Sequence, residues 1–381
     1  MPKAPRRRFD TRDPESSQLI DALLERAREA HGLEPGSEAA ESIREIMVTA
    51  LRLAADSTPT GDLKLLTASI KELRHALRVF APYEAQRKVA VFGSARTKAD
   101  HPEWHQAYRF AERIVEEGWM VITGAGSGIM GAAQAGAGRD ASFGLNIRLP
   151  FEQEANETID GDPKLINFRY FFTRKVMFVK PSHAIALLPG GFGTHDEGFE
   201  SLTLIQTGKS EIMPVVCLDV RGGSYWRDWE HYVRTHLAGP GLVSESDMSL
   251  FKVTDDVEVA VHEVLNFYSN YHSSRFVRDR LLIRLREAPG EAQLDELNVR
   301  FGDIVTRGRI EVVEPAAPEK DEAPGLPRIA FRFDRRSVGR LRQLIDQVNT
   351  WVPVSFSPPA DACAHEIVAG QVPEDFDDVI W

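Results

Sequence analysis

Residues 184–194 have the sequence AIALLPGGFGT, and this stretch decides the fold class of the chain. A continuous apolar run leads into a glycine-rich turn, and a pattern with helical spacing follows as far as residue 207. A strand without polar alternation is typical of a parallel sheet that is covered on both faces. The stretch therefore predicts one strand–turn–helix unit of a doubly wound sheet.

The same pattern recurs on both sides of this stretch. Short apolar runs that we expect to form strands lie at residues 89–92, 120–122, 143–147 and 215–218. Segments with helical spacing separate these runs, at residues 104–117, from about 128, and at 173–180. This alternation predicts an α/β fold with a Rossmann-like, doubly wound parallel sheet. Ligands of such folds bind beyond the carboxyl ends of the strands.

Two further parts flank the predicted sheet. Residues 1–85 carry leucine and isoleucine at helical spacing and predict an N-terminal helical extension. Residues 271–381 predict a small C-terminal α+β accessory domain with an acidic tail at 374–378. Its expected strands lie at 275–286, 310–313 and 329–333, and its expected helices at 291–305 and 338–350. The Rossmann-like domain is expected at 86–270.

Composition excludes several classes of protein. The chain has 381 residues and a formal net charge of −11, which argues against broad contact with a nucleic-acid backbone. Its two cysteines, Cys217 and Cys363, lie far apart, which excludes a disulfide framework and a cysteine zinc site. No apolar run is long enough to span a membrane, and the first thirty residues lack the apolar region of a signal peptide. We expect a cytoplasmic protein that binds neither nucleic acid nor membrane.

Three glycine-rich turns follow expected strands, at residues 93–96 (GSAR), 124–131 (GAGSGIMG) and 190–194 (GGFGT). Each lies between a strand and a helix, where unpaired backbone N–H groups and the helix dipole favour an anion. Glycine also lets the backbone approach phosphate oxygens closely. A single turn of this kind is explained more simply as a tight connection. Three at the same edge of one sheet favour a ligand that carries phosphate.

Two common nucleotide sites do not fit these turns. The spacing of the glycines at 124–128 departs from the dinucleotide motif, and the strand at 143–147 runs into Arg148 where a ribose-binding acid would stand. No turn carries the lysine of a P-loop, and Gly208-Lys209-Ser210 lies at the end of a helix. We therefore disfavour NAD-linked hydride transfer and ATP hydrolysis.

Polar residues near the third turn have both a structural and a functional explanation. Thr194 and Glu197 have the spacing of a capping box at the start of a helix, and spacing alone slightly favours that explanation. Arg174 and Lys175 open the preceding helix, where two cations oppose the helix dipole, which suggests that they serve a ligand. The alternative for Arg174 is a surface salt bridge, which would contribute little.

These motifs together resemble those of the LONELY GUY (LOG) family. Members are Rossmann-like nucleoside 5′-monophosphate phosphoribohydrolases, many of them long labelled lysine decarboxylases. The resemblance covers residues 88–268 and rests on Arg174-Lys175, on PGGFGT at 189–194 followed by Glu197, and on GSGIMG at 126–131. The segments 146–153 (NIRLPFEQ) and 171–180 (FFTRKVMFVK) resemble the bacterial branch. The older label implies pyridoxal phosphate, for which we find no Schiff-base lysine context.

The resemblance implies hydrolysis of the N-glycosidic bond of AMP or a cytokinin riboside monophosphate, which gives free base and ribose 5-phosphate. It implies no metal or organic cofactor, and a homo-oligomer of two or more subunits. It assigns catalysis to Arg174 and Glu197. It assigns substrate binding to Gly93, Ser94, Gly126, Lys175, Gly190, Gly191, Gly193 and Thr194. A carrier or sensor that binds a nucleotide without hydrolysis is the alternative.

Two residues depart from the family pattern. His195 and Gly198 stand where an apolar residue such as Leu is expected, whereas Asp196 and Glu197 are retained. Glycine inside a helix costs up to about 1 kcal/mol relative to alanine. These departures concern substrate preference and turnover more than the fold.

Overall fold

The computed structural model describes residues 13–148, 154–315, 323 and 325–354. The acidic tail at 374–378 lies outside these ranges. The chain divides into two compact units, Met1–Lys71 and Glu72–Trp381. No helix in the described ranges is long and apolar enough to cross a membrane. The expected limits of the three parts, 1–85, 86–270 and 271–381, stay a prediction.

The first unit is helical. It contains α1 (Pro14–His31), α2 (Glu38–Ala55) and the beginning of α3 (Thr60–Phe80). Asp13 caps α1, because its carboxylate accepts hydrogen bonds from the first backbone N–H groups of the helix. The buried Arg44 of α2 pairs with Asp21 of α1 at 3.1 Å and so joins the two helices. This part confirms the predicted N-terminal helical extension.

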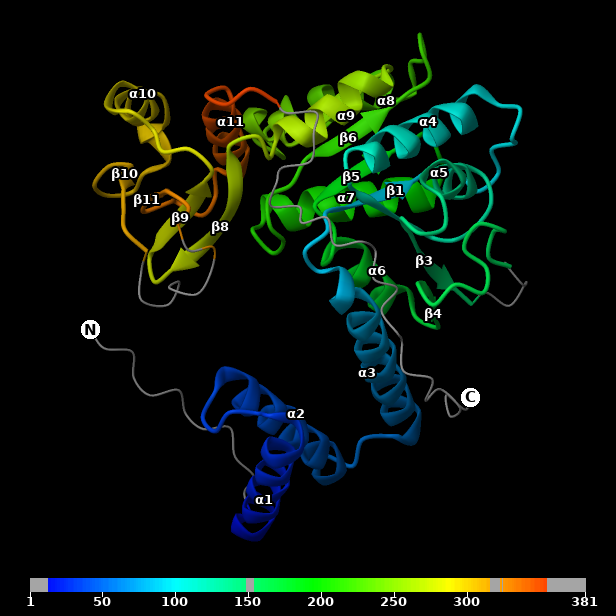
Figure 1. The fold of residues 1–381 in the computed structure, drawn as a ribbon, viewed down its shortest axis with the longest axis vertical. Coiled ribbons are helices and arrows are strands. Elements are labelled where there is room, and N and C mark those ends of the chain that lie inside the picture. Colours follow the sequence, from blue (N-terminus) through cyan, green and yellow to red (C-terminus); the bar gives the residue numbers. More distant parts are fainter. Residues whose placement is uncertain (1–12, 149–153, 316–322, 324, 355–381) are drawn as a thin grey trace. The chain divides into compact units, whose positions relative to one another are not determined.

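A seven-stranded parallel sheet forms the main part of the second unit, with helices on both of its faces (Figure 1). Its order is β4-β3-β2-β1-β5-β6-β7. The strands are β1 (Lys88–Phe92), β2 (Met120–Thr123), β3 (Ser142–Ile147), β4 (Leu165–Phe168), β5 (Ala184–Leu187), β6 (Val215–Leu218) and β7 (Phe251–Thr254). The helices are α4 (Pro102–Glu116), α5 (Ile129–Ala137), α6 (Phe171–Val179), α7 (Phe192–Gln206), α8 (Tyr225–Val233) and α9 (Val257–Asn266). The doubly wound, Rossmann-like fold is confirmed.

The two outer strands of this sheet, β4 and β7, were not expected from the sequence. Each lies at an edge of the sheet and pairs with only one neighbouring strand. β4 alternates between buried and exposed residues, and β7 contains the exposed Lys252. Neither therefore has the continuous apolar run that identifies the central strands.

A small antiparallel sheet follows, in the order β10-β11-β9-β8. Its strands are β8 (Tyr271–Val277), β9 (Arg280–Leu285), β10 (Glu311–Val312) and β11 (Arg328–Phe331), and they accompany α10 (Glu291–Phe301) and α11 (Val338–Asn349). The side-chain oxygen of Asn349 accepts hydrogen bonds from the backbone N–H groups of Asn270 and Tyr271, at 3.0 and 2.8 Å. The predicted C-terminal α+β part is confirmed, and its apolar residues share one core with the large sheet.

The direction of strand order reverses between β1 and β5, and this point positions the site. In a doubly wound sheet, the loops after two such strands diverge to opposite faces and leave a crevice between them. The turns at 93–96 and 190–194 follow β1 and β5, and the turn at 124–131 follows the neighbouring β2. The three glycine-rich turns thus lie at one edge of the sheet, as predicted.

Candidate functional site

Direct hydrogen bonds join the three glycine-rich turns. The backbone N–H of Ser94 donates to the carbonyl of Pro189 at 3.1 Å, which links the first turn to the third. The N–H of Ile129 donates to the carbonyl of Ser94 at 2.9 Å, and the hydroxyl of Ser127 donates to the carbonyl of Ala95 at 2.9 Å. The second turn is therefore tied to the first. Together the turns form one continuous backbone surface at the switch point.

Close packing between the turns requires glycine at two positions. A Cβ atom on Gly190 would lie 2.2 Å from Oγ1 of Thr194 and 2.9 Å from the backbone nitrogen of Ser94. Gly128 has a φ of 67°, and a Cβ there would lie 2.3 Å from the carbonyl oxygen of Ser94. Any side chain at either position would push the turns apart.

The second turn contains a strained residue that a half-buried asparagine stabilises. Ala125 has a φ of 62°, which is unfavourable for a residue with a side chain. The side-chain amide of Asn156 lies 3.0 Å from the carbonyl oxygens of both Ala125 and Gly126, and 2.5 Å from Oε1 of Gln134. Asn156 thus holds the turn in this conformation. No motif surrounds Asn156, and the partners of its amide nitrogen lie more than twenty residues away, so the sequence did not indicate its role.

The third turn forms a candidate anion-binding site at the start of α7. The helix begins at Phe192, and its first hydrogen bonds run from the N–H groups of Thr194 and His195 to the carbonyl of Gly191. No described residue accepts a hydrogen bond from the exposed N–H groups of Gly191, Phe192 or Gly193. Free N–H groups at a helix N-terminus are a favourable site for phosphate.

This geometry corrects the capping box expected from Thr194 and Glu197. The N-cap residue is Gly191, and no side chain caps the helix. Thr194 is the third residue of α7 and is buried, with its side chain packed against Gly190. The glycines allow the helix to start earlier than the spacing predicted, so that Glu197 stands in its second turn.

Glu197 is a buried carboxyl group. Only 6% of the residue is exposed, and this burial raises the pKa of Glu197 to about 7. The cations of Lys175 and Arg174 lower that pKa but do not offset the burial. A carboxyl group with this pKa exists in both protonation states near neutral pH, which suits proton transfer.

Lys175 contacts the acidic residues of α7. Its Nζ lies 2.8 Å from Asp196, 2.5 Å from Glu200 and 3.8 Å from Glu197. The lysine thus neutralises part of a cluster of three carboxylates. Its assignment to substrate binding stays a prediction.

Arg174 is a half-buried cation without an ion-pair partner among the described residues. Its guanidinium lies between the rings of Phe171 and Phe178, at 5.0 and 5.4 Å from their centroids, and its Nε makes no hydrogen bond within the described part of the chain. Burial lowers the pKa of Arg174, whereas the charge of Glu197 raises it. One terminal nitrogen would lie 3.9 Å from a Cβ on Gly124, so the guanidinium stands beside the second turn. The group is available to an anionic ligand.

The two residues that depart from the family pattern are both accommodated. A Cβ on Gly198 would lie 3.0 Å from the side chain of Leu187, so glycine allows α7 to approach β5 closely. Nε2 of His195 lies 2.7 Å from the hydroxyl of Tyr225, the first residue of α8. Tyr225 was not expected at the site, because nothing in the sequence around it indicates a contact with the third turn.

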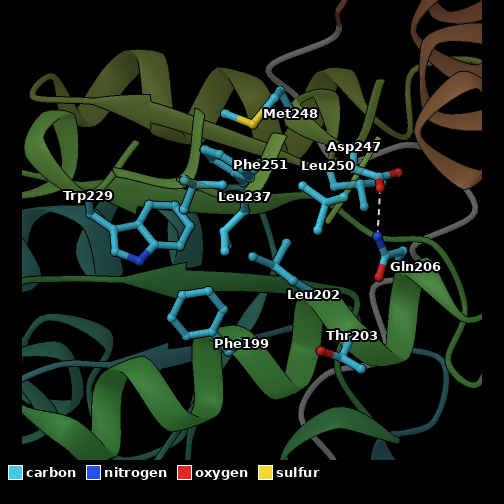
Figure 2. Close-up of a pocket in the computed structure, with 12 residues that line it drawn as sticks. Phe199, Leu202, Thr203, Gln206, Trp229, Leu237, Asp247, Met248, Leu250 and Phe251 are labelled. Atoms are coloured by element: carbon cyan, nitrogen blue, oxygen red, sulfur yellow. Dashed lines mark hydrogen bonds between the residues drawn. The ribbon is translucent and has the colours of Figure 1, made fainter. Parts of the chain in front are cut away.

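An apolar cavity lies against another face of α7. It has a volume of about 80 Å³, and Figure 2 shows Phe199, Leu202 and Trp229 among its walls. Phe199 and Leu202 are 200° and 140° around the helix from Glu197, at 100° per residue. None of the predicted site residues lines this cavity, so it is separate from the anion site.

The fold and the site define a Rossmann-like protein with a candidate anion-binding site at the switch point of its sheet. Residues 129–264 match a family model described as "Possible lysine decarboxylase", and this segment includes Arg174, Glu197 and the third turn. This match agrees with the resemblance to the LOG family, whose members are often described in this way. A search of curated protein sequences gives no match.

Two solved structures illustrate what the chain is similar to. A molybdenum cofactor binding protein from Rippkaea orientalis has 18% sequence identity and a TM-score of 0.33, over 46% of this chain and 94% of that one. The molybdenum cofactor carrier protein of Chlamydomonas reinhardtii has 22% identity and a TM-score of 0.31, over 46% and 94%.

Proposed function

We propose that this protein hydrolyses the N-glycosidic bond of nucleoside 5′-monophosphates, of the AMP or cytokinin riboside monophosphate type. One combination of groups carries the proposal: an open anion site at the start of α7, with the unpaired cation Arg174 and the carboxyl group of Glu197 at the same sheet edge. The match of residues 129–264 to the LOG family model supports the same reaction.

The anion site would hold the 5′-phosphate. The free N–H groups of Gly191, Phe192 and Gly193 and the dipole of α7 favour a dianion at this position. Binding of the phosphate orients the ribose before the reaction, and this lowers the entropic part of the barrier. Hydrolysis would therefore depend on the phosphate, although the phosphate takes no part in bond breaking.

Glu197 and Arg174 would act on the ribose and the base. As the C1′–N bond breaks, the electron pair leaves with the base and positive charge develops on the ribose ring. The Glu197 carboxylate would stabilise that charge and orient the water that adds to C1′. The water proton passes to the departing base, and Arg174 would hold the substrate or assist the departure of the base. The products are free base and ribose 5-phosphate, and no metal or organic cofactor takes part.

The site also suits a carrier or sensor that binds a nucleotide without hydrolysis, and one experiment distinguishes the two. Purified protein is incubated with AMP, other monophosphates and isopentenyladenosine monophosphate, and free base is measured by chromatography. Adenosine is the control without phosphate. The proposal predicts base release from at least one monophosphate and none from adenosine. Tight binding without base release would establish the carrier.

We further propose a cytoplasmic location, because two distant cysteines fit a reducing compartment, and a homo-oligomer, because the family resemblance implies one. Light scattering coupled to size-exclusion chromatography tests this directly. A mass equal to one 42.6 kDa chain would contradict it.

A further inference from the structure

A chain of two hydrogen bonds connects α8 and α7 to the third turn. The hydroxyl of Tyr225 donates to the carbonyl oxygen of Gly190 at 2.6 Å. Nε2 of His195 lies 2.7 Å from the same hydroxyl. Because the single hydroxyl proton goes to the carbonyl, the imidazole nitrogen has to be the donor. The order is therefore His195, Tyr225, Gly190.

The accepting carbonyl belongs to a peptide unit of the anion site. No described peptide bond is cis, and in a trans unit the C=O and the next N–H point in opposite directions. When Tyr225 holds the carbonyl of Gly190 on one side, the N–H of Gly191 must point to the other side. That N–H is one of the free donors at the start of α7.

Glycine on both sides makes this peptide unit easy to rotate. Neither Gly190 nor Gly191 has a side chain that would restrict rotation of the unit between them. A rotated unit would present a carbonyl oxygen to the phosphate in place of a donor. The hydrogen bond from Tyr225 therefore selects the orientation that binds an anion.

His195 fixes the hydroxyl of Tyr225 in turn. Its imidazole lies near the rings of Tyr225 and Trp226, at centroid distances of 5.8 and 5.7 Å. Burial lowers the pKa of His195 and raises that of Tyr225, so both groups are neutral near pH 7. Leucine, the type of residue expected at position 195, has no donor for this hydroxyl.

We propose that Tyr225 and His195 are positioning residues, which hold the Gly190–Gly191 peptide with its N–H toward a phosphate monoester. The identity of the ligand rests on the proposed function. The chain of hydrogen bonds adds selectivity for ligands with phosphate and makes no contact with the glycosidic bond.

Tyr225→Phe tests the first link, and Tyr232→Phe on the same helix is the matched control, since that tyrosine is half exposed and its ring lies near His236. Binding of inorganic phosphate and ribose 5-phosphate is measured by calorimetry, and AMP hydrolysis by initial rates. Loss of one neutral hydrogen bond should weaken phosphate binding and raise KM about 3- to 10-fold, with kcat little changed. Tyr232→Phe should match the wild type in every measurement.

His195→Leu, alone and combined with Tyr225→Phe, tests the order of the two hydrogen bonds. His195→Leu should weaken phosphate binding less than Tyr225→Phe, and His195→Gln, which restores a donor, should recover most of the loss. In the Tyr225→Phe background, His195→Leu should have little further effect, since the side-chain hydrogen bond between His195 and the Tyr225 hydroxyl is already removed. Additive effects would show that His195 acts by another route and would overturn this part.

The outcomes separate this inference from the proposed function. If the wild type binds phosphate but releases no base from any monophosphate, the proposed function fails, and the calorimetry still decides the role of Tyr225. Unchanged phosphate affinity in Tyr225→Phe overturns the inference even when the enzyme is active. The inference is also overturned if Tyr225→Phe lowers only kcat and leaves KM unchanged. It is overturned as well if the wild-type protein binds no phosphate.

Discussion

Glu197→Gln should remove activity and, at alkaline pH, make the protein more stable. The glutamine side chain has about the same size and polarity as glutamate but cannot ionise. In the wild type the carboxyl group is buried, and its pKa is raised from 4.5 to about 7. Ionisation of Glu197 therefore costs the folded state free energy that the unfolded chain does not lose.

The sign and size follow from this pKa. Between pH 4.5 and 7 the folded state keeps a proton that the unfolded state has released, so the free energy of unfolding falls as the pH rises. Each tenfold step in the acid constant corresponds to about 1.4 kcal/mol, so the full cost above pH 7 is about 3 kcal/mol. Glu197→Gln avoids that cost. It should equal the wild type in stability near pH 4.5 and exceed it by up to about 3 kcal/mol at pH 8.

Urea unfolding of both proteins from pH 4.5 to 8.5, followed by tryptophan fluorescence, measures this difference. Groups that titrate equally in both proteins cancel from the comparison. Glu200→Gln is the control for loss of an ion pair, because it removes another carboxylate from Lys175. A difference between wild type and Glu197→Gln that does not change with pH would refute the reasoning. So would full activity of Glu197→Gln, which would leave Glu197 without a role in hydrolysis.

Three further substitutions test other parts of the site. Gly190→Ala should abolish binding of inorganic phosphate in calorimetry, because its Cβ would lie 2.2 Å from Oγ1 of Thr194. Arg174→Met should lower kcat/KM for AMP at least about 100-fold without loss of stability, since it removes a half-buried charge that has no ion pair among the described residues. Asn156→Ala should lower the free energy of unfolding by about 1–3 kcal/mol, because it leaves buried acceptors of the second turn unsatisfied. Urea titration checks the last two, and equal stability of Asn156→Ala and wild type would contradict its role.

The sequence was sufficient to predict the central strands and to predict that the three turns lie at the same edge of the sheet. Continuous apolar runs such as 184–188 identify buried parallel strands, and the glycine clusters mark where they end. The edge strands β4 and β7 were not predicted. They are partly exposed, and their exposed positions carry polar residues that interrupt the apolar run. The fold class can therefore be predicted from the local sequence pattern. Edge strands cannot, because their exposure depends on which strands lie beside them in the folded sheet.

The site was predictable only in part. The spacing of Thr194 and Glu197 suggested a capping box, but the glycines start α7 at Phe192 and leave Glu197 buried in its second turn. The contacts of Asn156 and Tyr225 join residues more than twenty positions apart. No local pattern encodes such contacts, because they arise only when the turns meet at the sheet edge.

The central claim is that this anion site breaks a glycosidic bond. The most direct test incubates wild type and Glu197→Gln with AMP and with isopentenyladenosine monophosphate, and measures free base and ribose 5-phosphate together by chromatography. We predict equal amounts of both products from the wild type, none from Glu197→Gln, and none from adenosine. Binding of the monophosphates without either product would contradict the claim and identify the protein as a carrier or sensor.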